Sequence, residues 1–411
     1  MIATNTKVVH AGVLLADARE APKRQQSLVI EGTRIKSITA GFIDPPPGAT
    51  VIDLRDKFVL PGLIDCHVHL TMQFGPDFRV QLVTDSDPKI GFNAAHRAAL
   101  TLGAGFTTVR DVGALGNPDV IFALRDAIAE GTIAGPRVLC VGVIISPTGG
   151  HGQLHGYRQD VCACVHSTSG RCDGVDDCRR AVRQQVSYGA DAIKFVATGG
   201  VLSDTKTGLD QQFTREEIQT IVDTAHALGR RVAAHAHSAA GINAALEAGV
   251  DSIEHGSFMD DRSIELFLEK GAFHVPTVIA GMTVLELSKG PDMSEAQAEK
   301  ARIVGKQIKD ALTRSYKAGV RIAFGTDMAV GRHGENAREF RYMEEAGMSA
   351  RDCLAAATVN AAELLNISEL AGTLAPGKSA DIIAVDASPL EDLTELERVR
   401  FVMARGAVFK A

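Results

Sequence analysis

Histidines end several apolar segments of this sequence at a spacing suited to metal binding. His67 and His69 end one such segment, and His235 and His237 end another. Because side chains alternate between the two faces of a strand, the members of each pair point to the same side. Two imidazoles arranged in this way are able to bind one metal ion.

Three further residues occupy comparable positions. His255 and Asp327 each end an apolar segment, and Lys194 lies inside another. A buried ammonium without a partner costs free energy, so Lys194 needs a group that neutralises or pairs it. One histidine alone is usually a hydrogen-bonded core residue, but a cluster leaves several polar groups unsatisfied unless a cation binds there. The predicted metal ligands are His67, His69, Lys194, His235, His255 and Asp327.

The elements that position these residues are repeated strand and helix units. Short apolar segments alternate with longer segments of helical periodicity, such as 176–188 and 215–228, and Thr214 and Glu217 form a capping box before the latter. Strands are expected at 63–70, 107–112, 138–145, 192–197, 231–237, 252–255, 273–278 and 321–327. Eight successive βα units predict a closed (β/α)8 barrel of the TIM type, whose active site lies at the carboxyl ends of the strands.

The two ends of the chain have a different pattern. Residues 7–57 and the C-terminal segment contain short alternating apolar stretches separated by Gly, Pro and Asp turns, which is typical of β-strands. Neither end is long enough to bury a core alone. We therefore predict a small β-sandwich domain formed by residues 1–58 and 369–411, with the metal-dependent hydrolase barrel in residues 59–368.

Composition narrows the classes of function. The 411 residues are 45% hydrophobic and 23% charged, with a formal net charge of −7, which is typical of a soluble globular protein. No Lys/Arg run suggests a nucleic-acid or membrane surface, and no apolar stretch approaches the roughly 20 residues that span a bilayer. Residues 1–7 lack the features of a signal peptide. These features favour a cytoplasmic protein, and an exported mature form whose signal peptide has been removed stays open.

Four cysteines, Cys162, Cys164, Cys172 and Cys178, lie close together. Their spacing differs from the Cys-x2-Cys pairs of structural zinc sites. A disulfide between Cys172 and Cys178 and free thiols on a surface loop are the remaining interpretations, and we favour free thiols. Cys66 lies between two predicted ligands but should point away from them, which argues against thiol catalysis.

Other catalytic classes lack their sequence signatures. No Gly-x-Ser-x-Gly elbow follows a strand, and the Gly-rich segments lack the spacing of nucleotide sites. The absence of Trp and the presence of only four Tyr do not suggest an aromatic-walled sugar or nucleobase site. A metal-free scaffold for protein assembly would have no need of all six predicted ligands.

The ligand pattern resembles the binuclear branch of the amidohydrolase superfamily. The resemblance covers essentially the whole chain, because segments 58–67 and 372–382 are similar to the family's junctions between barrel and β domain. Segments 194–200, 235–237 and 252–256 resemble the branch that contains imidazolonepropionase-related peptidases, meaning prolidase-like Xaa-Pro dipeptidases and ochratoxin-hydrolysing amidases.

This resemblance implies two divalent metal ions, usually zinc, that activate the hydrolytic water. It also implies that Lys194 is carboxylated by CO2 and that its carbamate bridges the two ions. One ion would be bound by His67, His69 and Asp327, and the other by His235 and His255. The resemblance further implies a homo-oligomer.

Catalytic and substrate-binding roles follow from this arrangement. Asp327 is expected to act as general base and then as general acid, and His237 to hydrogen-bond the carbonyl oxygen of the substrate. A dipeptide-like substrate also needs a cation or donor for its free carboxylate, and two loops carry such groups. The candidates are His151, His155, Tyr157, Arg332 and His333.

We therefore predict a zinc-dependent dipeptidase or carboxypeptidase-type amidase that cleaves the amide bond to a C-terminal amino acid. N-acyl amino acids such as ochratoxin A are included in this prediction. The alternative in the same fold is a cyclic-amide hydrolase of the imidazolonepropionase or hydantoinase type. The expected partner is a small-molecule amide or dipeptide, with no nucleic acid and no membrane.

Overall fold

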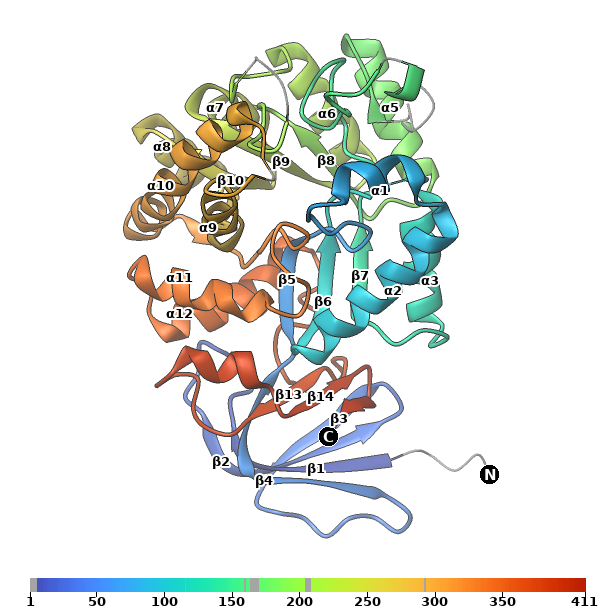
Figure 1. Ribbon diagram of the computed structural model, residues 1–411. Helices are drawn as coiled ribbons and strands as arrows, with labels where there is room; N and C mark the ends of the chain where they lie inside the picture. The colour runs from blue at the N-terminus through green and yellow to red at the C-terminus, as the bar shows by residue number, and fades with distance from the viewer. Residues whose placement is uncertain (1–5, 115, 159, 163–169, 204–207, 292) are drawn as a thin grey trace.

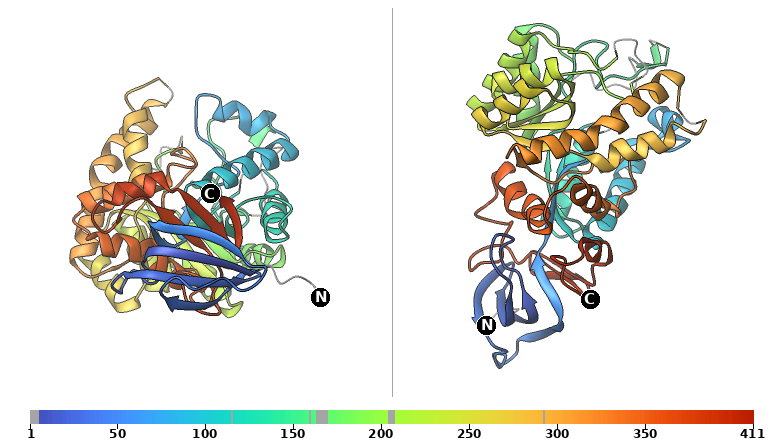
Figure 2. Two further views of the ribbon diagram at one scale, coloured as in Figure 1. Left: turned by 90° about the horizontal axis from the view of Figure 1, so that it is seen from below. Right: turned by 90° about the vertical axis from the view of Figure 1, so that its left-hand side faces the viewer.

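Eight parallel strands in the middle of the chain form a barrel, and both chain ends meet in a second sheet below it (Figure 1). The structure is a computed structural model that describes residues 6–114, 116–158, 160–162, 170–203, 208–291 and 293–411. The two sheets lie end to end along the molecule, as the side view in Figure 2 shows.

The barrel consists of two parallel ladders. The first contains β5 (Leu63–Val68), β6 (Phe106–Asp111) and β7 (Arg137–Cys140), and the second contains β8 (Ala192–Val196), β9 (Arg231–Ser238), β10 (Ser252–Phe258), β11 (Phe273–Val275) and β12 (Arg321–Ile322). Each of the eight strands predicted from the sequence is present, so the predicted (β/α)8 barrel is confirmed.

Single β-bridges join the two ladders and close the barrel. Ile145 pairs with Phe195 on one side, and Val68 pairs with Met328 on the other. The strands at these joints are shorter than predicted. β7 ends before Gly142, whose positive φ of 77° turns the chain out of the ladder.

Helices surround the barrel, both on its outer surface and around its mouth (Figure 1). They are α1 (Phe78–Thr84), α2 (Asp87–Gly103), α3 (Asp119–Ala129), α5 (Val175–Ser187), α6 (Arg215–Ala227), α7 (Ala239–Ala248), α8 (Asp261–Lys270), α9 (Val278–Leu287), α10 (Glu295–Lys317), α11 (Glu339–Glu345), α12 (Ala350–Ala355) and α13 (Ala361–Leu364). α12 and α13 are joined by a π-helical turn, Ala356–Asn360, and 3-10 turns occupy Asn336–Arg338 and Leu393–Arg398. No helix among the described residues is long and apolar enough to span a bilayer.

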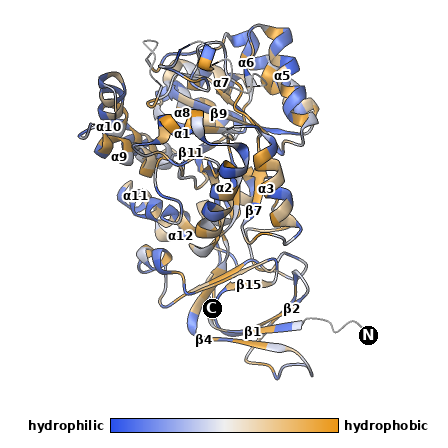
Figure 3. Cartoon of the chain, turned by 45° about the vertical axis from the view of Figure 1, so that its right-hand side comes forward, coloured by the Kyte–Doolittle hydropathy of each residue, from blue (hydrophilic) through white to orange (hydrophobic). Residues whose placement is uncertain are grey.

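Local sequence signals explain the helices that were predicted. α6 starts at the expected capping box, in which Thr214 accepts a hydrogen bond from the Glu217 backbone and Glu217 reaches back to Thr214. The helices combine polar and apolar segments (Figure 3). Their buried residues, such as Ile218 and Val222 of α6, pack with strand residues such as Phe195 in the main hydrophobic core.

The chain ends form one seven-stranded mixed sheet. Its order is β15 (Ala407–Lys410), β14 (Phe401–Ala404), β13 (Ile382–Val385), β4 (Thr50–Pro61), β1 (Thr6–Leu14), β2 (Lys23–Glu31) and β3 (Arg34–Ala40). β4 links its two halves, because β4 pairs with β1 and its last four residues also pair with β13. Side chains from both halves, such as Leu28 and Phe401, share one apolar core. This is the sandwich-like arrangement that the sequence predicted.

The clustered cysteines differ from their predicted setting. Cys172 and Cys178 are free thiols, as favoured, and their sulfur atoms lie 3.5 Å apart. Both are buried in the main core and do not lie on a surface loop. Cys162 is partly exposed, and Cys164 lies outside the described residues.

A buried ion pair joins the barrel to the terminal sheet. Arg137, which starts β7, donates to the Asp381 carboxylate at 3.0 Å and to Ser379 Oγ at 3.1 Å. The second Asp381 oxygen accepts from the Arg405 backbone at 2.7 Å. Asp381 is 5% exposed, so its charge depends on these partners.

We expect Asp381→Ala to reduce the free energy of unfolding by about 3 kcal/mol, because the change leaves the Arg137 guanidinium without its buried counter-charge. Urea denaturation monitored by circular dichroism measures this change. Asp386→Ala is the control, since its pairs with Arg400 and Lys57 are exposed and should contribute less than about 1 kcal/mol. Equal losses in both variants would contradict the proposed importance of the junction.

Candidate metal centre

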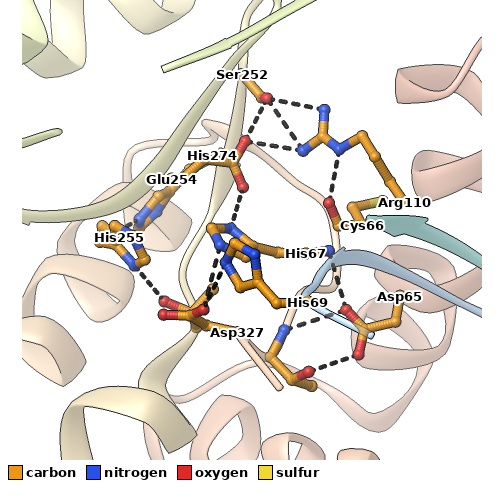
Figure 4. Close-up of polar contacts among 12 residues, drawn as sticks. Asp65, Cys66, His67, His69, Arg110, Ser252, Glu254, His255, His274 and Asp327 are labelled. Atoms are coloured by element: carbon orange, nitrogen blue, oxygen red, sulfur yellow. Dashed lines mark hydrogen bonds and ion pairs between the residues drawn. The ribbon is translucent and has the colours of Figure 1, made fainter. Parts of the chain in front are cut away.

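The histidines and the Asp327 carboxylate predicted from the strand ends converge at the mouth of the barrel. Figure 4 shows His67, His69, His255 and Asp327 among them. β5 carries His67 and leads into His69, β9 carries His235 and His237, and β10 carries His255. Among the described residues, two groups are able to hold a metal ion, and the ligand atoms of each group lie within 4.8 Å of one another. The groups are His67, His69 and Asp327, and His235, His237 and His255.

The first group is centred on the Asp327 carboxylate. One Asp327 oxygen lies 3.4 Å from His67 Nε2 and 3.2 Å from His69 Nε2. Burial alone would raise the pKa of Asp327, but the facing imidazoles hold it well below its usual value. The carboxylate is therefore ionised and available as a ligand.

The other ring nitrogens of this group are fixed by the barrel. His67 Nδ1 donates to Glu254 Oε2 at 2.7 Å, and His69 Nδ1 donates to the Gly113 carbonyl at 2.8 Å. A donating Nδ1 leaves the lone pair of a neutral imidazole on Nε2, which faces Asp327. This orientation is the one that metal-binding histidines require.

The second group brings three imidazoles into ring contact. The His235 and His255 ring centroids lie 4.6 Å apart, and the His237 ring stacks on His255 at 5.0 Å. His237 Nδ1 is hydrogen-bonded to Ser257 Oγ and His255 Nδ1 to Thr277 Oγ1. His237 therefore belongs to this group together with the two predicted ligands, His235 and His255.

Burial controls the protonation of these histidines. It lowers the pKa of His237 to about 3 and holds the pKa values of His235 and His255 well below the usual value, and the nearby Lys194 acts in the same direction on all three. Neutral imidazoles retain a lone pair at neutral pH. The second group thus presents three nitrogen donors of the kind that zinc prefers.

Lys194 lies on strand β8, which pairs with the strand β9 that carries His235 and His237. It is 2% exposed, and burial lowers the pKa of its ammonium to about 8, against the opposing effect of Glu254 and Asp327. Among the described residues, no hydrogen bond to Lys194 Nζ is found. A lowered pKa leaves a larger neutral amine fraction, which is the form that reacts with CO2. The two groups of donors therefore fit divalent metal ions.

A buried charge network lies beneath the first group, and sequence reasoning missed it. Glu254 accepts from Arg110 at 2.8 Å, from Ser252 at 2.5 Å and from His67 (Figure 4). Burial opposes ionisation of Glu254, but Arg110 and His67 hold its pKa far below the usual range. Arg110, a charged residue inside the buried strand β6, was the sequence signal that could have revealed the network.

Backbone conformations at the strand ends explain why alternation did not reveal Glu254. His255 has a φ of 70°, Asp327 a φ of 57° and Thr277 a φ of 49°, all in the left-handed region that non-glycine residues rarely adopt. Ideal alternation would send Glu254 and His255 to opposite faces of β10. The left-handed turn at His255 instead lets both reach the centre, and such strain is typical of functional sites.

A cavity of about 840 Å³ opens above the centre, and most of the predicted substrate contacts line it. His151, His155, Tyr157 and Arg332 belong to its lining, but His333 does not. His333 is 6% exposed and its Nε2 donates to the Met72 carbonyl, so its side chain is buried beneath the loop that carries it. The structure therefore does not bring His333 together with the other predicted substrate contacts.

The four predicted substrate-binding residues that line the cavity differ in their contacts with the rest of the protein. The His151 ring lies against His235, with centroids 4.4 Å apart, and its Nδ1 is hydrogen-bonded to Ser203 Oγ. Burial lowers the pKa of His151 to about 3, so it is neutral. His155 donates to the Gly150 carbonyl, and the Tyr157 hydroxyl donates to the Arg79 carbonyl.

Arg332 is the lining candidate that carries a positive charge. Its side chain is exposed at the rim of the cavity. No carboxylate lies within ion-pair distance of it in the part of the chain that the structure describes. Arg338, also on the rim, is paired with Glu335 at 2.7 Å.

Known proteins share this fold and much of this sequence. Residues 58–408 match the amidohydrolase family. A solved Xaa-Pro dipeptidase with methionine bound in its active site has a TM-score of 0.93 and 41% identity, covering 99% of this chain and 100% of that chain. Ochratoxinase of Aspergillus niger is 33% identical over 98% of this chain and 86% of its own, and imidazolonepropionase of Thermoplasma acidophilum is 23% identical over 93% and 88%.

We expect Glu254→Gln to weaken zinc binding roughly 10- to 100-fold, because the amide no longer orients the His67 imidazole as a carboxylate does. Competition with a chromophoric chelator measures the affinity, and melting temperature verifies folding. Glu339→Gln is the matched control, since Glu339 is equally buried but accepts hydrogen bonds from Val278 and Ile279 instead. An unchanged affinity in a folded Glu254→Gln variant would contradict the role assigned to Glu254.

Proposed function

Because this chain belongs to the amidohydrolase family and is a hydrolase of amide bonds, we propose that it uses two zinc ions to release a C-terminal amino acid from its substrate. The observation that supports this most directly is the pair of ligand groups that line one large cavity together with Lys194. The proposed reaction is that of a dipeptidase or carboxypeptidase-type amidase.

The two ligand groups account for two metal ions. His67, His69 and Asp327 would hold one ion, and His235 and His255 the other, with carboxylated Lys194 between them. When bound, the ions would lower the pKa of the hydrolytic water and polarise the scissile carbonyl.

Asp327 is the residue proposed to move the proton. Its low pKa keeps it ionised, so it is able to accept a proton from the attacking water. The same carboxyl group then donates that proton to the leaving amine. One Asp327 oxygen lies 3.4 Å from His67 Nε2 and 3.2 Å from His69 Nε2, so the carboxylate faces the centre.

His237 is proposed to stabilise the oxygen of the scissile carbonyl as it becomes negative. Its ring is fixed by Ser257 and by stacking on His255, so little reorganisation is needed in the transition state. Acting as a donor requires a proton on Nε2, with Ser257 donating to Nδ1. Ligation by His237 instead would require a free Nε2 lone pair.

The proposed recognition of the substrate's C-terminal amino acid follows from the relatives and from the residues at the rim of the cavity. A Xaa-Pro dipeptidase releases a C-terminal proline, and the chain shares 41% identity with such a protein. A C-terminal amino acid carries a carboxylate, for which the exposed Arg332 guanidinium is the cation proposed here. His151, His155 and Tyr157 add hydrogen-bonding groups along the same cavity.

The first test measures amino acid release by zinc-loaded protein from Xaa-Pro dipeptides, other dipeptides and N-acyl-phenylalanine, with a cyclic imide alongside. We expect release of the C-terminal amino acid, loss of activity on chelation, and recovery on adding zinc. Asp327→Asn should reduce kcat at least about 100-fold, because it removes the general base. Activity on the cyclic substrate alone would instead assign the protein to ring-opening hydrolysis.

Arg332→Gln should raise KM about tenfold or more for substrates with a free C-terminal carboxylate while changing kcat little, because it removes a charge-assisted hydrogen bond. C-terminally amidated analogues should show no such change. Arg338→Gln is the control, since that guanidinium is already paired with Glu335. Equal effects on acid and amide substrates would show that Arg332 does not recognise the carboxylate.

A further inference from the structure

The end of strand β10 serves both halves of the metal centre. Glu254 and Ser257 hydrogen-bond one histidine in each of the two ligand groups, and His255 is itself a predicted ligand. This arrangement depends on the backbone at His255 and Gly256, whose φ values of 70° and 64° both lie in the left-handed region. A left-handed non-glycine residue costs free energy, so surrounding contacts must hold it in place.

His274 of the neighbouring strand β11 contacts this left-handed turn with its side chain (Figure 4). Its Nε2 lies 3.0 Å from the carbonyl oxygen of His255. Backbone pairing between β10 and β11 ends at Glu254 and Val275. The imidazole of His274 therefore extends the contact between the two strands past the end of their backbone pairing, at the point where β10 turns.

The two hydrogen-bond partners of His274 determine where its proton lies. A carbonyl oxygen only accepts, so the contact with His255 requires the proton on Nε2. Nδ1 lies 2.9 Å from Ser315 Oγ of α10. Neither partner is an anion, so the buried ring is neutral and its Nδ1 accepts. The Ser315 hydroxyl then donates to His274 and not to the Leu312 carbonyl, its other acceptor within reach at 3.0 Å.

Gly256 allows the His274 ring to approach the turn this closely. A Cβ atom at position 256 would lie 2.9 Å from His274 Nε2 and 2.9 Å from Met259 Cε, which is closer than such atoms pack. The side chains of His274 and Ser315 are both fully buried. Bulk water therefore does not replace the ring as a donor, and loss of the ring would cost the buried carbonyl this hydrogen bond.

We propose that His274 is a positioning residue of the metal centre. Its Nε2–H group holds the His255 carbonyl in the left-handed turn, and this turn directs both His255 and Glu254 into the centre. A chain of hydrogen bonds thus connects Ser315 on the outer helix α10 to the second ligand group. The inference rests on the metal centre of the proposed function and does not depend on which substrate that centre hydrolyses.

The test replaces His274 with side chains that differ in the position of their donor. The amide nitrogen of His274→Gln stands as many bonds from Cα as Nε2 does and is able to reach His255. The shorter amide of His274→Asn corresponds to Nδ1 and reaches only Ser315, and His274→Phe keeps a ring but has no donor. We expect zinc affinity to fall roughly 10- to 100-fold in the Asn and Phe variants and to stay within about threefold of the parent in the Gln variant.

Competition with a chromophoric chelator measures the affinity, and the melting temperature of the metal-free protein reports stability separately. Visible absorption of bound Co²⁺, which depends on ligand geometry, should change in the Asn and Phe variants and not in the Gln variant. Should His274→Phe fail to fold, His274→Asn decides, because it retains the contact with Ser315.

His10→Phe is the matched control for the loss of a buried histidine. His10 is also buried, and its Nε2 contacts the Ile43 carbonyl at 3.1 Å, but it lies on β1 of the terminal sheet. This variant should lose stability and still bind zinc as the parent protein does.

The outcomes separate this inference from the proposed function. Unchanged zinc affinity in the folded Asn and Phe variants overturns it. Equal losses in the Gln, Asn and Phe variants also overturn it, because packing and not the donor would then be responsible, and so does an equal loss in His10→Phe. Failure of the parent protein to bind zinc overturns the proposed metal centre as well. Zinc binding without release of any amino acid overturns the proposed reaction and leaves this inference standing.

Discussion

Five imidazoles and a lysine share the mouth of this barrel, and they are able to do so only while most of them carry no charge. Burial keeps the pKa values of His235, His237 and His255 low, and it lowers the pKa of Lys194 as well. The same burial that would be unfavourable for cations therefore produces a set of neutral nitrogen donors. Such a set is the starting point for binding divalent ions, because a protonated ligand has no lone pair to offer.

The two carboxylates of the centre each contact an imidazole, but they lie at different depths in the barrel. Glu254 lies below the imidazoles, where Arg110 neutralises it and Ser252 and His67 complete its hydrogen bonds. Asp327 lies among them, at a left-handed backbone position just beyond the short strand β12. The closure of the barrel matters for this arrangement, since Val68 and Met328, the residues next to His67 and Asp327 in the chain, bridge the first and last strands.

Sequence periodicity predicted the barrel and the clustering of the histidines for the same physical reason. Alternation along a strand fixes which side chains share a face, so the sequence alone pairs His67 with His69 and His235 with His237. Alternation fails where the backbone leaves the extended region, and Glu254 was missed because His255 makes that departure. His333 shows a different limit of sequence analysis. It is a polar residue close to Asp327 in sequence, but the sequence does not say on which side of the loop its side chain lies. The burial of Cys172 and Cys178 likewise depends on packing against segments that are distant in sequence, which no local pattern contains.

The cavity divides its tasks between two kinds of element. The predicted ligands lie on barrel strands or in the segments that follow them, whereas apolar side chains that line the cavity, such as Val201, Val284 and Val304, lie on α9, α10 and loops at the barrel mouth. These side chains therefore belong to different elements from the predicted ligands. This separation gives a physical reason why relatives named for dipeptides, for ochratoxin and for a ring amide share one framework. In this framework the residues at the strand ends serve the reaction, and the side chains that line the cavity above them serve the choice of substrate.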